Sequence, residues 1–148
     1  MNNLLRVAVL ALPAILALTL WGCSNSSPVA SPATPSQEPE PIARTEFTDR
    51  LENFFEYEPL HAGKPSQFRI HLTDLSDGAP VEKAEVSLIV RPKGVSETTV
   101  QTTARIGKVT GIYVAELNVP RSGEYDIEFH IKNTKLDERL SLSDFKVE

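Results

Sequence analysis

The sequence contains one cysteine, Cys23, and one methionine, Met1, among its 148 residues. A lone cysteine has no disulfide partner within the chain, so the folded part must be held together by its apolar core. Soft sulfur ligands are the ones that Cu(I) prefers, and their scarcity disfavours a Cu(I) site. The spacings H-x-H, C-x-x-C and H-E-x-x-H are also missing, as are nucleophile-elbow and phosphate-loop patterns. We therefore expect no enzyme.

Positive charge and long apolar runs are scarce as well. The chain has 15 basic and 20 acidic side chains, a net charge of −5, and Arg6 is the only charged residue before Glu38. An acidic surface does not favour nucleic acid or anionic lipid headgroups, so we expect no nucleic-acid partner. Beyond the N-terminal segment no run of about 18 apolar residues occurs, which predicts no further membrane span.

The N-terminal segment has the features of an export signal. Arg6 precedes an apolar run, Val7 to Leu20, of about 14 residues, the length of a signal-peptide core and too short for a membrane span. The run ends in Leu20-Trp21-Gly22-Cys23, which resembles the cleavage site of bacterial lipoproteins. The resemblance implies removal of residues 1–22 and a lipid on Cys23, through which the protein would bind a membrane. The alternative is a free Cys23 thiol on an uncleaved anchor.

Residues 23–43 are predicted to be a linker that begins with the lipidated cysteine. Five of the 19 residues from Ser24 to Ile42 are proline and none is aromatic, so the segment cannot bury enough apolar surface to fold and is expected to be a disordered tether. Ser24 follows the cysteine. By resemblance to the sorting rule of enteric bacteria, this implies an envelope lipoprotein that faces the periplasm, with the outer membrane favoured over the inner.

Residues 44–148 read as one all-β domain. Apolar and polar residues alternate in short runs, the pattern of half-buried strands. We predict an immunoglobulin-like β-sandwich of about seven strands. The expected strands span 46–57 (two pieces with a bend near Asp49 and Arg50), 67–73, 84–91, 97–106 (an exposed edge), 111–119, 124–131 and 140–147. A slip in the apolar phase between Leu142 and Phe145 predicts a bulge, and Tyr125 is either a tyrosine corner or a plain core aromatic.

Several segments of this domain resemble a known family. They are Leu51 to Leu60 (LENFFEYEPL), Ala62 to Phe68 (AGKPSQF), His71 to Leu75 (HLTDL), Pro80-Val81, Gly111 to Tyr113 and Ser122 to Tyr125. Their order resembles the N-terminal β-sandwich of periplasmic adaptor subunits of heavy-metal RND efflux systems, and is similar more loosely to YtkA-like and FixH-like domains. The resemblance implies a place near metal or drug export, with an RND efflux or other envelope complex as partner. The coiled-coil hairpin, lipoyl-like and barrel domains of a full adaptor have no counterpart in these 148 residues.

Two kinds of site follow from these residues. Glu56, His61 and His71 are candidate ligands for Zn(II) or Cu(II), because imidazole and carboxylate groups suit these ions; the alternative is ordinary surface histidines. The Thr-rich stretch from Val100 to Ala104 is a candidate sheet edge for protein binding. The sequence thus predicts a non-catalytic accessory or interaction module, linked to efflux or envelope metal handling. The alternative is a structural envelope lipoprotein whose protein contacts are unrelated to transport.

Overall fold

The computed structural model describes residues 40–148, and these contain ten β-strands and no helix. The predictions for the signal peptide, for Cys23 and for the tether as far as residue 39 lie outside the described residues. The strands are β1 (Ile42–Phe47), β2 (Leu51–Tyr57), β3 (Pro65–Asp74), β4 (Ala79–Pro80), β5 (Glu85–Pro92), β6 (Val100–Thr103), β7 (Arg105–Ile106), β8 (Ile112–Asn118), β9 (Gly123–Lys132) and β10 (Asp137–Val147).

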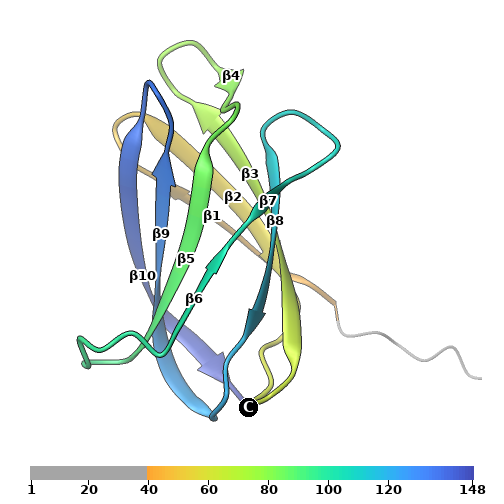
Figure 1. Ribbon diagram of the computed structural model, residues 1–148, viewed down its shortest axis with the longest axis vertical. Helices are drawn as coiled ribbons and strands as arrows, with labels where there is room; N and C mark the ends of the chain where they lie inside the picture. The colour runs from red at the N-terminus through yellow and green to blue at the C-terminus, as the bar shows by residue number, and fades with distance from the viewer. Residues whose placement is uncertain (1–39) are drawn as a thin grey trace, which may run out of the picture. The chain divides into compact units, whose positions relative to one another are not determined.

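The strands form two antiparallel sheets that lie face to face as two layers (Figure 1). Sheet A has the order β1-β2-β3-β8-β7, with β4 paired to the end of β3, and sheet B has the order β10-β9-β5-β6. In each strand, every second side chain points toward the other sheet, since successive residues of a strand point to opposite faces. The prediction of an all-β, sandwich-like domain is confirmed.

The core between the sheets is built around aromatic rings. Phe55 of sheet A lies against Phe129 of sheet B with ring centroids 4.8 Å apart, and both side chains are fully buried. Phe145 of β10 lies 6.4 Å from Phe55. Tyr57 and Phe68 stack at 4.9 Å within sheet A. Aromatic pairs at these distances add to the stabilisation that burial itself provides, so the core can hold the domain without a disulfide.

Two local predictions are confirmed, and the structure shows how Tyr125, for which two alternatives were open, is placed. The register between β9 and β10 shifts between Leu142 and Phe145, at the predicted bulge. The 46–57 stretch consists of two strands, although they form a hairpin, β1 and β2, and β1 begins at Ile42, two residues before the predicted domain boundary. The hydroxyl of Tyr125 donates a hydrogen bond to the carbonyl oxygen of Arg121 at 2.9 Å, the geometry of a tyrosine corner.

The prediction of one edge strand over 97–106 is wrong in its extent. The structure divides this stretch into β6, at the edge of sheet B, and β7, at the edge of sheet A. The chain crosses between the sheets at Ala104, which is buried and donates its backbone N–H to the carbonyl oxygen of Val86 at 2.7 Å. A small buried residue lets the chain turn inward there, and alternation alone gives no sign of that crossing.

Candidate functional site

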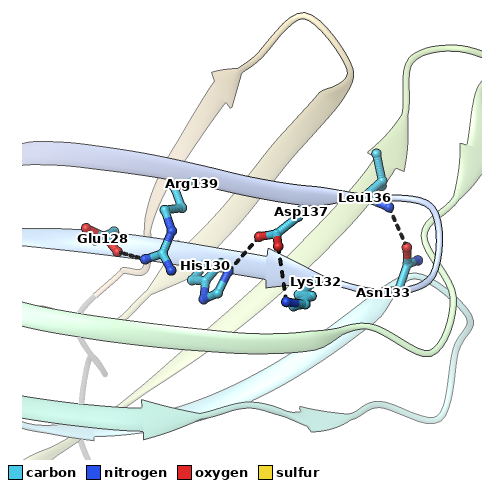
Figure 2. Close-up of polar contacts among 7 residues, drawn as sticks. All are labelled: Glu128, His130, Lys132, Asn133, Leu136, Asp137 and Arg139. Atoms are coloured by element: carbon cyan, nitrogen blue, oxygen red, sulfur yellow. Dashed lines mark hydrogen bonds and ion pairs between the residues drawn. The ribbon is translucent and has the colours of Figure 1, made fainter.

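The outer face of sheet B carries two groups of ion-paired side chains, of which Figure 2 shows the part on β9 and β10. Asp126, on the same face of β9, differs from them, because its buried Oδ1 has no hydrogen-bond partner among residues 40–148. Glu128 of β9 lies between two arginines: its Oε2 is 3.2 Å from Arg91 Nη1, and its Oε1 is 2.6 Å from Arg139 Nη1. These residues meet because Arg91 stands on β5 and Arg139 on β10, the two strands that pair with β9. Only 14% of the Glu128 side chain is exposed, so its two ion pairs are partly shielded from water.

A second group continues this charged face toward the β9–β10 turn. His130 Nε2 lies 2.8 Å from Asp137 Oδ1, and Lys132 Nζ lies 3.2 Å from Asp137 Oδ2. The hydrogen bond from His130, followed by that from Lys132, lowers the pKa of the Asp137 carboxyl below its usual range. The turn itself is closed by the Asn133 side chain, which accepts hydrogen bonds from the backbone N–H groups of Lys135 and Leu136 at 2.8 Å each.

The outer face of sheet A is different. Phe54 of β2 stands directly opposite His71 of β3, and His71 stands opposite Ile112 of β8, so the three side chains form one row across the sheet. The rings of Phe54 and His71 meet edge to face with centroids 5.2 Å apart. On β1 the row ends at Thr45, which is opposite Phe54. Two further apolar residues border the row: Val114 of β8, opposite Arg69, and Phe47 of β1, which is opposite Glu52 and 62% exposed. We call Phe47, Phe54, His71, Ile112 and Val114 the sheet A stripe.

The stripe leaves one polar atom without a partner. His71 Nε2 is buried and has no hydrogen-bond partner among residues 40–148. The ion pair on this face, between Arg69 Nη1 and Glu56 Oε2, is long at 3.6 Å and involves an arginine that is 56% exposed. Such a pair contributes little to stability. The outer face of sheet A therefore combines half-buried apolar side chains with few charges that form ion pairs.

The three candidate metal ligands are not assembled into a metal site. Glu56 and His71 share the outer face of sheet A, but Glu56 pairs with Arg69, and His71 packs against Phe54. His61 lies in the segment between β2 and β3. Its sequence neighbours Leu60 and Ala62 form backbone hydrogen bonds with Glu148 at the C-terminus. Within residues 40–148 no group of three or more His, Cys, Asp or Glu side chains could hold a metal ion. The metal site therefore stays a prediction, in which Glu56 and His71 are diagonal neighbours on sheet A and His61 lies on a separate segment.

The loop end of the sandwich carries a further polar recess beside Asp74. Its lining includes Asp77, Glu82 and Lys83 from one side and Lys135 from the β9–β10 turn. The side chain of Asp74 is already engaged: its Oδ1 accepts hydrogen bonds from the Ser76 hydroxyl at 2.6 Å and the Ser76 backbone N–H at 2.9 Å. These bonds lower the pKa of the Asp74 carboxyl. The carboxylate thus closes a turn and is not positioned as an acid or base for a substrate.

The sheet A stripe was not predicted from the sequence, although one signal for it exists. In β2, Phe54 occupies the phase of Glu52 and Glu56, and therefore points to the outer face. An aromatic residue in the polar phase of a strand indicates an apolar spot on the surface. The pairing of Phe54 with His71 could not be predicted, since it depends on the register between β2 and β3.

Comparisons with protein-family models, with curated proteins and with solved structures found no match. Among residues 40–148, no helix is present that is long and apolar enough to cross a membrane.

Proposed function

We propose that this protein is a non-catalytic, lipid-anchored module of the bacterial envelope that binds another envelope protein through the outer face of sheet A. The observation that carries the proposal is the sheet A stripe. Half-buried Phe54 and His71, with exposed Phe47 beside them, form an apolar area on a face that has little charge pairing of its own. Grouped apolar side chains on a surface mark sites of association more often than isolated ones do.

The order of the strands supports an immunoglobulin-like fold for the domain. The series β2-β3-β8-β7 in one sheet and β10-β9-β5-β6 in the other corresponds to strands A-B-E-D and G-F-C-C′ of that fold. The Tyr125 hydroxyl bonded to the Arg121 carbonyl at the start of β9 is a further feature of such domains. Sandwiches of this kind serve many unrelated functions, so the function rests on the stripe and not on the fold.

The proposed location and partner come from the sequence. Leu20, Gly22 and Cys23 support lipid attachment, and Ser24 favours the outer membrane. The resemblance to efflux-adaptor sandwiches supports an RND efflux or other metal-handling complex as the partner. If the protein bound to the stripe is not a transport component, the alternative holds, and the chain is a structural lipoprotein of the envelope.

Membrane attachment is tested by replacing the lipid acceptor. We expect the wild-type chain to fractionate with membranes and to label with a radioactive fatty acid. Cys23→Ser should abolish the label and leave the chain uncleaved, because thioether attachment of lipid requires the thiol. Label that persists in Cys23→Ser would rule out the proposed anchor.

The binding face is tested with two matched variants of the full-length chain. Phe54→Arg places a charge in the stripe, and Ser141→Arg places the same charge on the outer face of sheet B, where Ser141 is exposed and opposite Glu128. After affinity isolation from membranes, a partner retained by wild type and by Ser141→Arg should be lost from Phe54→Arg. A partner lost equally from both variants, or retained by both, would contradict binding through the stripe. The identity of the partner then decides between a transport role and a structural one.

A further inference from the structure

The edge strand β1 differs from the other sheet edges of residues 40–148. β6 and β7 are short, with four and two residues, and β10 is interrupted by its bulge and bridged near its end by Leu60, which pairs with Val147. Short strands and bulges are the usual means by which proteins prevent pairing at a sheet edge. β1 has neither feature. Its six residues pair with β2 in unbroken register, and its other side pairs with no strand of the described chain.

Proline and lysine, two further means of protecting an edge, are absent from β1, whose sequence is IARTEF. Its two charges, Arg44 and Glu46, point toward the interior side of the sheet, because they stand opposite Phe55 and Asn53, which are both buried. Inward charges normally discourage a second strand, since they would be buried without a partner. Here they are of opposite sign and lie two residues apart, so the same strand can supply the partner charge.

The sequence of β1 is self-complementary about Thr45. In an antiparallel pair with a second copy, a two-fold axis at Thr45 places Arg44 opposite Glu46 of the second copy, and Glu46 opposite its Arg44. An axis at Arg44 or at Glu46 would instead oppose like charges, which is destabilising. With the axis at Thr45, the exposed ring of Phe47 also lies opposite Ala43 of the second copy, the smallest side chain of the strand.

The two charges are partly exposed and fixed in position. Arg44 Nη2 and Glu46 Oε1 already form an ion pair at 2.7 Å, and their side chains remain 28% and 32% exposed. The Arg44 guanidinium is held in place over the ring of Phe145, 5.0 Å from its centroid, and its Nη1 donates to the Ser143 carbonyl oxygen at 3.3 Å. A second copy would therefore meet charges that are positioned beforehand, which lowers the entropy lost on association.

We propose that β1 pairs antiparallel with β1 of a second copy about Thr45, so that the two A sheets become one continuous sheet across a dimer. The inference goes beyond the proposed function, because it rests on the strand edge; of the stripe it involves Phe47 alone, at the β1 end. It would place two sheet A stripes on one continuous face.

Disulfide trapping tests the proposal in the full-length chain. Directly opposed residues of an antiparallel pair have Cα atoms about 4.5–5.5 Å apart, within the range of about 4.4–6.8 Å that a disulfide spans. Thr45→Cys, oxidised with copper phenanthroline in the cell envelope, should give a disulfide-linked dimer at several times the yield of Thr103→Cys. Thr103 is an exposed threonine of the edge strand β6, and the wild-type chain controls for Cys23. Equal yields, or trapping of Thr45→Cys on a different protein, would overturn the proposal.

Charge exchange tests the register. In the Thr45→Cys background, Arg44→Glu gives a strand with two negative charges, and Glu46→Arg gives one with two positive charges. Each variant alone should trap several-fold less dimer, since like charges then oppose each other. Coexpression of the two variants with different tags should restore trapping as a mixed dimer, because every opposed pair is again of opposite sign. A mixed dimer no more abundant than the self-dimers would contradict the axis at Thr45.

Discussion

The two outer faces of the sandwich are built from strands of the same kind but carry different chemistry. On sheet B, Glu128 binds two arginines and Asp137 binds His130 and Lys132, so these side chains satisfy one another, although the Asp126 Oδ1 of the same face has no partner among residues 40–148. On sheet A, the row through Phe54 and His71 is half-buried and contains no ion pair. A face whose groups already pair with each other gains little from a partner, whereas an apolar row gains free energy when it is covered.

The contrast also concerns how each face depends on solution conditions. The ion pairs of sheet B weaken with salt and at low pH, because both screening and protonation remove the charge. The sheet A stripe contains no ion pair and should respond less to salt. Substitutions placed in matched positions on the two faces can therefore separate stability from binding.

The largest difference in stability is expected between two glutamates. Glu128→Ala removes hydrogen bonds to Arg91 and Arg139 from a side chain that is 14% exposed, and should lower the free energy of unfolding by about 2 kcal/mol. Glu56→Ala removes a 3.6 Å pair on sheet A and should cost about 0.5 kcal/mol or less. Urea unfolding of both variants measures the difference. Equal losses would show that the charged face contributes no more than the other.

A substitution beneath the stripe should stabilise sheet A without changing its surface. Asn53 of β2 is fully buried, and its side-chain amide and carbonyl find no hydrogen-bond partner in the described part of the chain. A buried unsatisfied polar group costs free energy, so Asn53→Leu should raise the free energy of unfolding by about 1 kcal/mol. Thermal unfolding shows directly whether Asn53→Leu is more or less stable than the wild type. A less stable variant would indicate that the amide has a partner. The variant also provides a more stable background for Phe54→Arg.

Acid should weaken sheet B through Asp137. The pKa of this carboxyl is lowered in the folded state by His130 and then by Lys132, so its contribution is present above the unfolded value of about 3.9 and is lost as the pH falls through the folded value. We expect stability to fall below about pH 4 and Asp137→Asn to reduce that fall. Urea midpoints at pH 6 and pH 3 give the comparison, with Glu56→Gln on sheet A as the control. An unchanged slope in Asp137→Asn would refute the assignment.

The smallest expected effect is that of divalent metal. Because Glu56, His61 and His71 are not assembled as a group, we expect calorimetry with Zn(II) or Cu(II) to show no saturable one-to-one binding to the full-length chain. His61→Ala with His71→Ala should then change nothing. Saturable binding that this double variant loses would restore the metal site predicted from the sequence.

Much of the fold followed from alternation. The runs in β3, β8 and β9 have a clear period of two, and the same pattern located the bulge in β10 through its phase slip. Only part of β1 was predicted, because Ile42 and Ala43 directly follow a proline-rich stretch and were assigned to the linker. The crossing of the chain between the sheets at Ala104 was missed. This stretch is polar, so it lacks the alternation of apolar residues that would show which sheet each part belongs to.

The site was harder to predict than the fold because it depends on register. Alternation shows that Glu56 and His71 face outward on their own strands, but the neighbour of each is fixed only when β2 and β3 pair. That register brings Phe54 to His71 and Arg69 to Glu56, which creates the stripe and gives Glu56 an arginine as its neighbour. A tyrosine corner at Tyr125 could be named as one of two alternatives, because its hydrogen-bond acceptor lies only four residues away in the sequence.

The most direct test of the account is photo-cross-linking from the two faces in living cells. A photoreactive phenylalanine analogue would replace Phe54 in one full-length variant and Ser141 in another. The account predicts a covalent adduct with a different envelope protein from position 54 and none above background from position 141. Adducts of equal yield from both positions, or an adduct from position 141 alone, would contradict the claim that sheet A carries the binding face.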